Sequence, residues 1–132
     1  MTSRVVLDTS AYSHLRRGHE GVVAALARAT VVLVPATVLG ELHAGFSVGG
    51  RRVENERVLE DFLAEPFVTV VPVTADVARR YGEVHAALRR AGTPIPINDV
   101  WIAAAALDAG ATVLTFDADF ERIPGLSVDR LA

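Results

Sequence analysis

The sequence contains no cysteine and no lysine, and each absence excludes several kinds of chemistry. Without cysteine, the chain can form neither a disulfide nor a thiolate metal site. All 13 residues with a permanent positive charge are arginine, so the chain has no lysine for a P-loop, a Schiff base or a phosphorelay receiver. These exclusions hold even if the preference for arginine reflects nothing more than a GC-rich genome.

Long apolar runs are also absent. No stretch reaches the roughly 20 apolar residues that a membrane-spanning helix needs, and no charged segment leads into an apolar core as in a secretion signal. These features predict a cytoplasmic protein. The formal net charge of −3 argues against a basic nucleic-acid coat, so RNA binding would require local positive patches or bound metal to offset the acids.

The 132 residues are about the length of one domain, and we expect a single domain over residues 1–132. Hydrophobic residues make up 51% of the sequence, which favours a packed core over disorder. Neither a linker, a low-complexity tract nor an internal repeat interrupts the chain.

Short β-branched runs alternate with helical patterns along the chain. Strands are expected at residues 4–7, 30–34, 67–71 and 112–116, with an edge strand at 126–128. Helices are expected at residues 11–17, 21–28, 35–46, 51–64, 74–90 and 99–109. Continuous apolar strands are typical of parallel sheets that are covered on both faces. The pattern therefore predicts an α/β fold with a central parallel sheet of four to five strands flanked by helices.

Polar residues and proline mark the expected helix starts. Ser10, Thr74 and Asn98 each precede a helical pattern and can cap the backbone N–H groups of the first turn. Pro35 suits a first-turn position, where its missing N–H is not needed. The helix after Asn98 is apolar on all sides, which predicts that it is buried.

Four acidic residues stand where such a sheet would bring them together. Asp8 and Asp117 each follow an apolar strand, Asp99 begins a helix, and Glu41 interrupts an apolar helical run. Asp99, Glu41 and Asp117 also have ordinary explanations, as a helix-start acid, a solvated helix position and a turn former. Asp8 is harder to explain in that way, because the carboxyl ends of parallel strands are where open α/β sheets bind ligands.

Taken together, the four carboxylates predict a metal site. Carboxylates that meet at one point raise one another's pKa unless a cation neutralises them. Oxygen ligands without histidine or cysteine select hard cations, Mg²⁺ or Mn²⁺. Thr9, Ser10 and Thr115 are placed to support this site by hydrogen bonds to carboxylates or metal-bound water. Roles as helix caps or strand-end residues would explain the same three hydroxyls equally well.

At these residues the chain resembles the PIN-domain ribonucleases, and among them the VapC toxins of toxin–antitoxin pairs. The resemblance rests on Val6–Ser10, on Glu41-Leu42 followed by Gly45, on Ile97–Ala104, and on Leu114–Asp117 with Phe120. It implies that Asp8, Glu41, Asp99 and Asp117 are the catalytic acids and that Asp8, Asp99 and Asp117 bind the metal. Asp119 is a second carboxylate near the fourth position, and we assign it to the supporting residues.

The resemblance also implies what such a protein does. We expect a Mg²⁺- or Mn²⁺-dependent endoribonuclease toxin of a type II toxin–antitoxin system, which cleaves RNA phosphodiester bonds with metal-activated water. A homodimer and a VapB-like antitoxin partner are expected as well. Two alternatives remain: a metal-dependent phosphatase, and a non-catalytic RNA-binding or interaction module on a PIN scaffold. A phosphatase of the haloacid-dehalogenase type would need a second aspartate where Ser10 stands, and a lysine.

Arginine pairs and histidines provide weaker signals for RNA contact. Arg16 and Arg17 closely follow the first strand and could reach RNA phosphate near the acidic residues. Solvated helix faces would explain the same pairs. The four histidines suggest no metal cluster, although His14 is a candidate for lining the substrate groove.

The segment from Val38 to Phe62 predicts a partner surface. Apolar residues lie close to arginines here: Val48, Val53, Val58 and Leu59 beside Arg51, Arg52 and Arg57. An apolar groove rimmed by arginine suits an amphipathic helix from an acidic partner. We expect an antitoxin helix to dock here, although the same apolar residues could simply close the core.

Overall fold

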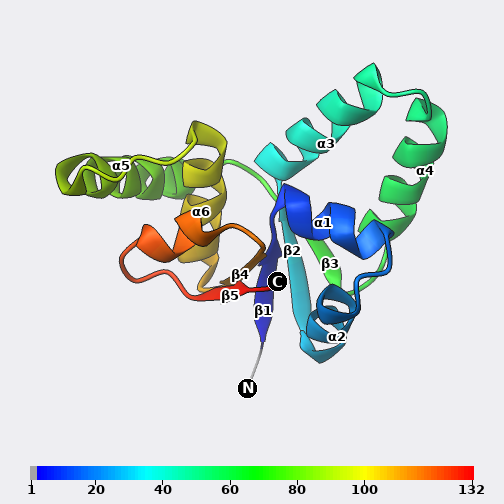
Figure 1. Ribbon diagram of the computed structural model, residues 1–132, viewed down its shortest axis with the longest axis horizontal. Coiled ribbons are helices and arrows are strands. Elements are labelled where there is room, and N and C mark those ends of the chain that lie inside the picture. The colour runs from blue at the N-terminus through cyan, green and yellow to red at the C-terminus, as the bar shows by residue number, and fades with distance from the viewer. Residues whose placement is uncertain (1–2) are drawn as a thin grey trace.

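Strand β1 (Arg4–Leu7) is the central strand of a five-stranded sheet in the computed structural model, which describes residues 3–132 (Figure 1). All neighbouring strands are parallel, in the order β3-β2-β1-β4-β5. The other strands are β2 (Val31–Pro35), β3 (Val68–Val71), β4 (Thr112–Thr115) and β5 (Val128–Arg130). The predicted parallel α/β sheet is confirmed, with five strands. The edge strand begins at Val128, two residues later than expected.

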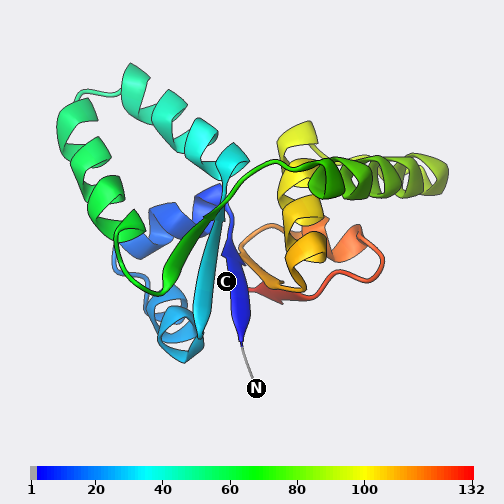
Figure 2. The same ribbon diagram turned by 180° about the vertical axis from the view of Figure 1, so that it is seen from behind.

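Helices cover both faces of this sheet. They are α1 (Thr9–Arg16), α2 (Glu20–Arg28), α3 (Ala36–Val48), α4 (Arg52–Leu63), α5 (Ala75–Ala91), α6 (Ile97–Ala109) and the short 3₁₀ helix η1 (Ala118–Arg122). Helices α1 and α6 both contact β1 and β4, from opposite faces (Figures 1 and 2). Helix α5 packs against α6, whereas α3 and α4 project beyond the carboxyl ends of the strands. In the described part of the chain, no helix is both long enough and apolar enough to cross a bilayer.

The core is built from the apolar runs that predicted the strands. Val6, Leu7, Val32 and Val113 are fully buried within the sheet. Helix α6 is buried as expected, and its alanines at positions 103–106 leave almost no exposed surface. Because alanine is small and has the highest helix propensity, this run lets α6 lie close to the strands and to α5. The first turn of α6 is thereby held at the edge of the sheet.

Two predicted helix caps are wrong. Helix α1 is capped by Asp8, whose carboxylate accepts a hydrogen bond from the Ala11 N–H, and not by Ser10. Helix α6 begins at Ile97, immediately after Pro96, so Asn98 lies inside the helix. Thr74 caps α5 as predicted, because its hydroxyl accepts from the Val77 N–H.

The strand order reverses next to β1. On one side of β1 the sheet continues through β2 to β3, and on the other side it continues through β4 to β5. Leu7 pairs with Leu114, so Asp8 and Thr115 follow side by side at the carboxyl ends of β1 and β4. In open α/β sheets, ligands bind at this reversal point.

Candidate active site

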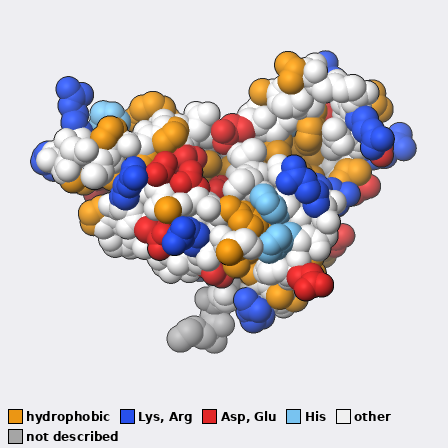
Figure 3. Space-filling model, viewed as in Figure 1, with side chains coloured by type: hydrophobic (Ala, Val, Ile, Leu, Met, Phe, Trp, Pro, Cys, Tyr) orange, Lys and Arg blue, Asp and Glu red, His pale blue; other side chains and the backbone are white. Residues whose placement is uncertain are grey.

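All four predicted acids lie around one cavity of about 580 Å³ at this reversal point. Asp8 follows β1, Glu41 lies on α3, Asp99 lies in the first turn of α6, and Asp117 precedes η1. Acidic side chains gather on the same face of the molecule, between the α5–α6 and α3–α4 parts (Figure 3). The remaining lining residues are Thr9, Ser10, Phe116, Ala118 and Arg130. The structure therefore brings together the residues that the sequence places far apart.

Asp8 is the most deeply buried of these acids, with 4% of its surface exposed. Its Oδ1 accepts hydrogen bonds from the Ala11 N–H (2.8 Å) and the Ser10 hydroxyl (3.0 Å), and its Oδ2 accepts one from the Thr115 hydroxyl. Burial raises the pKa of Asp8, and the three hydrogen bonds oppose this rise. The charge on Asp117 raises the pKa further. Ser10 and Thr115 thus act directly on Asp8, as predicted for supporting residues.

Asp99 has the most strongly perturbed carboxylate. Burial raises its pKa from 3.8 to about 6, assisted by the negative charges of Asp117, Asp8, Glu41 and Asp119. Several carboxylates that destabilise one another's charged forms are the pattern expected at a cation site.

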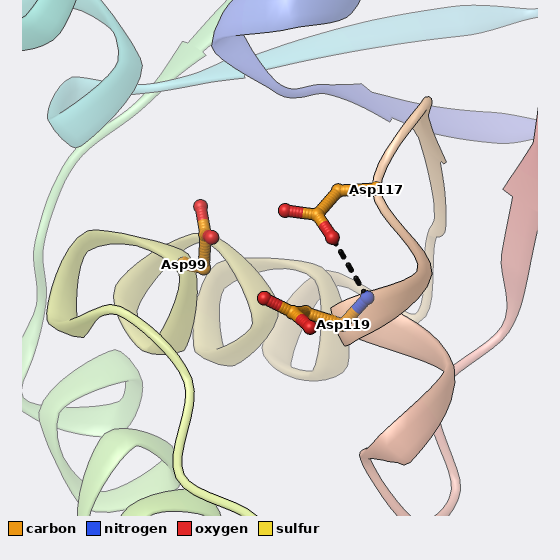
Figure 4. Close-up of side chains that lie close together, drawn as sticks. All are labelled: Asp99, Asp117 and Asp119. Atoms are coloured by element: carbon orange, nitrogen blue, oxygen red, sulfur yellow. Dashed lines mark hydrogen bonds between the residues drawn. The ribbon is translucent and has the colours of Figure 1, made fainter.

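Three carboxylates form the tightest group. One oxygen from each of Asp99, Asp117 and Asp119 lies within 4.8 Å of the other two. Figure 4 shows these side chains turned toward a common space. Asp117 Oδ1 also accepts a hydrogen bond from the Asp119 N–H (2.8 Å), and Asp119 forms an ion pair with Arg122 (3.1 Å). Asp119, which the sequence assigns to the supporting residues, therefore offers a further carboxylate oxygen beside Asp99 and Asp117.

Glu41 is held from two sides. The Thr9 hydroxyl donates to Glu41 Oε1 (2.6 Å), and the Asn98 amide donates to Glu41 Oε2 (3.4 Å). The side chain of Asn98 therefore orients an acid of the cavity and does not cap α6. Because both donors contact Glu41, its carboxylate keeps a fixed direction at the rim formed by α3.

Arg130 and Phe116 line the cavity and were not predicted as site residues. Arg130 pairs with Thr115 in the register of β4 and β5, and its Nε lies 2.8 Å from Glu121 Oε1. No local sequence pattern marks this arginine, because its position depends on the pairing of two strands. Phe116 directly precedes Asp117, and the sequence predicts it only as the last residue of an apolar strand.

The weaker candidates are not among the residues that line this cavity. Arg16 and Arg17 are exposed at the end of α1, and Arg16 lines neighbouring pockets between α1, α2, α3 and α4. His14 contacts Phe116, one of the residues that line the acidic cavity. RNA contact by Arg16 and Arg17 therefore stays a prediction.

The donor set fits a hard divalent cation. Every acid around the cavity offers carboxylate oxygens, and burial together with nearby negative charge raises the pKa of both Asp8 and Asp99. Mg²⁺ and Mn²⁺ prefer such oxygen ligands and would lower the repulsion. Asp99, Asp117 and Asp119 would hold the ion, with Asp8 and Glu41 beside it.

The sequence matches the PIN domain family over residues 5–126. The chain belongs to the PIN domain family. Ribonuclease VapC2 of Rickettsia felis is 30% identical over 105 residues, which cover 79% of this chain and 77% of that protein. Ribonuclease VapC5 of Mycobacterium tuberculosis is 29% identical over 124 residues, 91% of this chain and 87% of that protein. The resemblance seen in the sequence is therefore confirmed.

Solved structures of PIN domain proteins share the fold across nearly the whole chain. VapBC2 from Rickettsia felis, bound to a DNA fragment from its promoter, aligns with a TM-score of 0.86 at 26% identity and covers 98% of this chain and 99% of that chain. DNA-bound VapBC from Salmonella typhimurium also gives a TM-score of 0.86, at 27% identity, with 98% of both chains covered.

Thr115 joins two acids of this PIN domain, so its replacement should affect both. Its fully buried hydroxyl donates to Asp8 and accepts from the Asp117 N–H at 2.9 Å. We expect Thr115→Val to cost about 1–3 kcal/mol of stability and to weaken Mn²⁺ binding about 10- to 100-fold. Urea denaturation and titration calorimetry would measure the two effects. Thr115→Ser keeps the hydroxyl and should keep most of the affinity; equal losses in both variants would contradict this role.

Proposed function

We propose that this PIN domain protein is a VapC-type endoribonuclease toxin that depends on Mg²⁺ or Mn²⁺. The observation that carries the proposal is the acid cavity at the reversal point of the sheet, in a chain whose curated relatives are VapC ribonucleases. A divalent cation held there would activate water and stabilise negative charge that develops on the phosphodiester. RNA as the substrate would place this activity in the cytoplasm.

Different residues around the cavity would hold the cation and orient the phosphate. Asp99, Asp117 and Asp119 offer converging oxygens, while Asp8 is fixed by hydrogen bonds from Thr115, Ser10 and the Ala11 N–H. Arg130 supplies a positive charge at the cavity wall, where it can orient a phosphate oxygen. Its ion pair with Glu121 restricts the direction of the guanidinium.

A cleavage assay tests this proposal. Purified protein should cut single-stranded RNA in Mg²⁺ or Mn²⁺ and should not cut it in EDTA, with metal restoring the activity. An Asp108→Asn variant is a suitable control, because Asp108 is exposed on α6 outside the cavity lining. RNA binding without cleavage in either metal would favour the non-catalytic module, and hydrolysis of phosphomonoesters alone would favour the phosphatase.

A VapB-like antitoxin is the proposed protein partner. The solved neighbours from Rickettsia felis and Salmonella typhimurium are VapBC complexes. The predicted docking surface needs one correction: Leu59 is 1% exposed and belongs to the core. Val58 lines a pocket of about 220 Å³ with Tyr12, Phe46 and Arg51. Val48 and Val53 are 89% and 76% exposed at the junction of α3 and α4.

We expect substitutions in this pocket to weaken inhibition by the antitoxin without changing cleavage. Val58→Ser removes apolar contact, and Arg51→Glu reverses the charge that would attract an acidic helix. Each should raise the antitoxin concentration needed for half-inhibition about tenfold, as expected for a well-packed interface residue. Arg90→Glu, an equal charge change on α5, serves as the control. Titrations that superimpose on those of the unchanged protein would place the partner elsewhere.

We also propose a homodimer, as expected from the family resemblance. Light scattering on the purified chain over a concentration series would measure its mass directly. A constant monomer mass would contradict this proposal without affecting the assignment of the acid cavity.

A further inference from the structure

One aromatic ring lines the acidic cavity, and a second ring stacks on it. Phe116 lines the cavity and directly precedes Asp117. The ring of His14 stacks on Phe116, with 3.9 Å between ring centroids and 21° between ring planes. Both rings are partly exposed. Residues from α1 and from the end of β4 thus build one aromatic surface next to a predicted catalytic acid.

The structure holds these rings in place. His14 Nδ1 lies 2.8 Å from the carbonyl oxygen of Ser10, the residue whose hydroxyl donates to Asp8. His19 packs edge-on against both rings, at 5.5 Å from His14 and 5.0 Å from Phe116. A ring pair that is fixed before substrate arrives loses little conformational freedom on binding.

The surroundings suit a nucleic-acid strand. Figure 3 shows histidine side chains beside apolar ones, on the face that carries the acidic group. Arg16 and Arg17 are exposed near the end of α1, two and three residues after His14. Metal at the acids and the arginines at the end of α1 would both attract phosphate, and the exposed part of the ring pair offers an apolar face to a base.

We propose that the His14–Phe116 pair is a stacking platform for an unpaired base next to the cleaved phosphodiester. The inference rests on the proposed ribonuclease function. A base inside a duplex has both faces covered by its neighbours, whereas an unpaired base can stack on an aromatic side chain. His14 acts here as a positioning residue, because it holds the nucleotide and takes no part in bond breaking.

Binding of a fluorescein-labelled oligouridylate, followed by anisotropy, tests this platform. All proteins carry Asp99→Asn, so that the RNA is not cut during the titration. We expect His14→Ala to weaken binding about fivefold or more. The same substitution should leave binding of an abasic ribose-phosphate oligomer unchanged, and duplex RNA should not compete. His14→Phe, which keeps a ring, should restore the affinity.

His85→Ala is the matched control, because His85 also stacks on an aromatic ring, but that ring belongs to Tyr81, which, unlike Phe116, does not line the acidic cavity. It should bind as its parent does. The platform would be overturned if the His14→Ala protein bound the oligouridylate as tightly as its parent does. It would also be overturned if the substitution lowered the affinity for the abasic oligomer by the same factor.

Cleavage in Mn²⁺ by proteins that retain Asp99 separates the platform from the ribonuclease activity. His14→Ala should raise KM about fivefold or more and leave kcat within about twofold, because stacking contributes to substrate binding. Efficient cleavage by the His14→Ala protein with an unchanged KM would contradict the stacking platform and support the proposed ribonuclease function. If RNA binding depended on the base but the unsubstituted protein did not cleave, the ribonuclease function would be contradicted and the stacking platform supported.

Discussion

Replacing Asp99 with asparagine is expected to lower RNA cleavage about 1,000-fold or more and, in EDTA, to raise the melting temperature at neutral pH. The loss of activity follows from the metal, whose charge stabilisation is worth several kcal/mol, with each 1.36 kcal/mol equal to a tenfold change in rate. The gain in stability follows because burial, and then repulsion by the neighbouring acids, penalises the charge of Asp99, and asparagine carries no charge.

The pH dependence of this gain has a definite sign. The pKa of Asp99 rises from 3.8 to about 6 in the folded protein, chiefly through burial. The folded state therefore binds a proton more tightly than the unfolded state, and its stability falls as pH rises from about 4 through 6. Asp99→Asn lacks this loss, so its advantage should be small at pH 4 and largest above pH 6.

Thermal unfolding of both proteins in EDTA across this pH range would measure the difference. Asp108→Asn makes the same chemical change at an exposed position of the same helix and should show no such pH-dependent gain. Near-normal, metal-dependent cleavage by the Asp99→Asn protein would contradict the assignment of Asp99 to the metal site.

Divalent metal should produce the second large effect, on stability. A ligand that binds the folded state alone stabilises it by about 2.7 kcal/mol at 100 times its dissociation constant. For a domain of this size, that corresponds to a rise of about 10 °C in melting temperature. Calorimetry with Mn²⁺ against EDTA should show this rise, because one carboxylate oxygen from each of Asp99, Asp117 and Asp119 lies within 4.8 Å of the other two.

A double variant, Asp8→Asn with Asp99→Asn, provides the comparison. It should fold and should lose most of the rise with Mn²⁺. Asp108→Asn should keep the full rise. If the double variant gained as much stability from Mn²⁺ as the unchanged protein, the metal would bind at another place.

The sequence was most informative where a single physical requirement determined the structure. Valine-rich runs such as Val31–Val34 can be buried only in strands covered on both faces, and they form β1, β2 and β4 as expected. The alanine-rich run of α6 likewise leaves few places outside the core. Because parallel strands share one carboxyl edge, Asp8 and Asp117 could be placed together before the strand order was known.

Prediction failed where neighbouring residues competed for one role. Asp8 and Ser10 can both cap α1, and Asp8 does so because its carboxylate is fixed by Thr115, 107 residues later in the chain. The side-chain amide of Asn98 donates a hydrogen bond to Glu41 and does not cap the backbone of α6. Val58 and Leu59 differ by one helical position, and only the packing of α4 decides that Leu59 is the buried residue. These choices depend on tertiary contacts that no local pattern contains.

The strand order has a consequence for the time at which this enzyme can become active during its own synthesis. Asp8 emerges early from the ribosome, but β4, which pairs with β1 and carries Thr115, is among the last strands made. Domains are synthesised from the N-terminus, and contacts between distant residues form last. A nascent chain that lacks residues 99–119 has neither Asp99 nor Asp117 and cannot assemble the cavity. The acid cavity of the nascent chain therefore stays incomplete until β4 and the residues that follow it have been made.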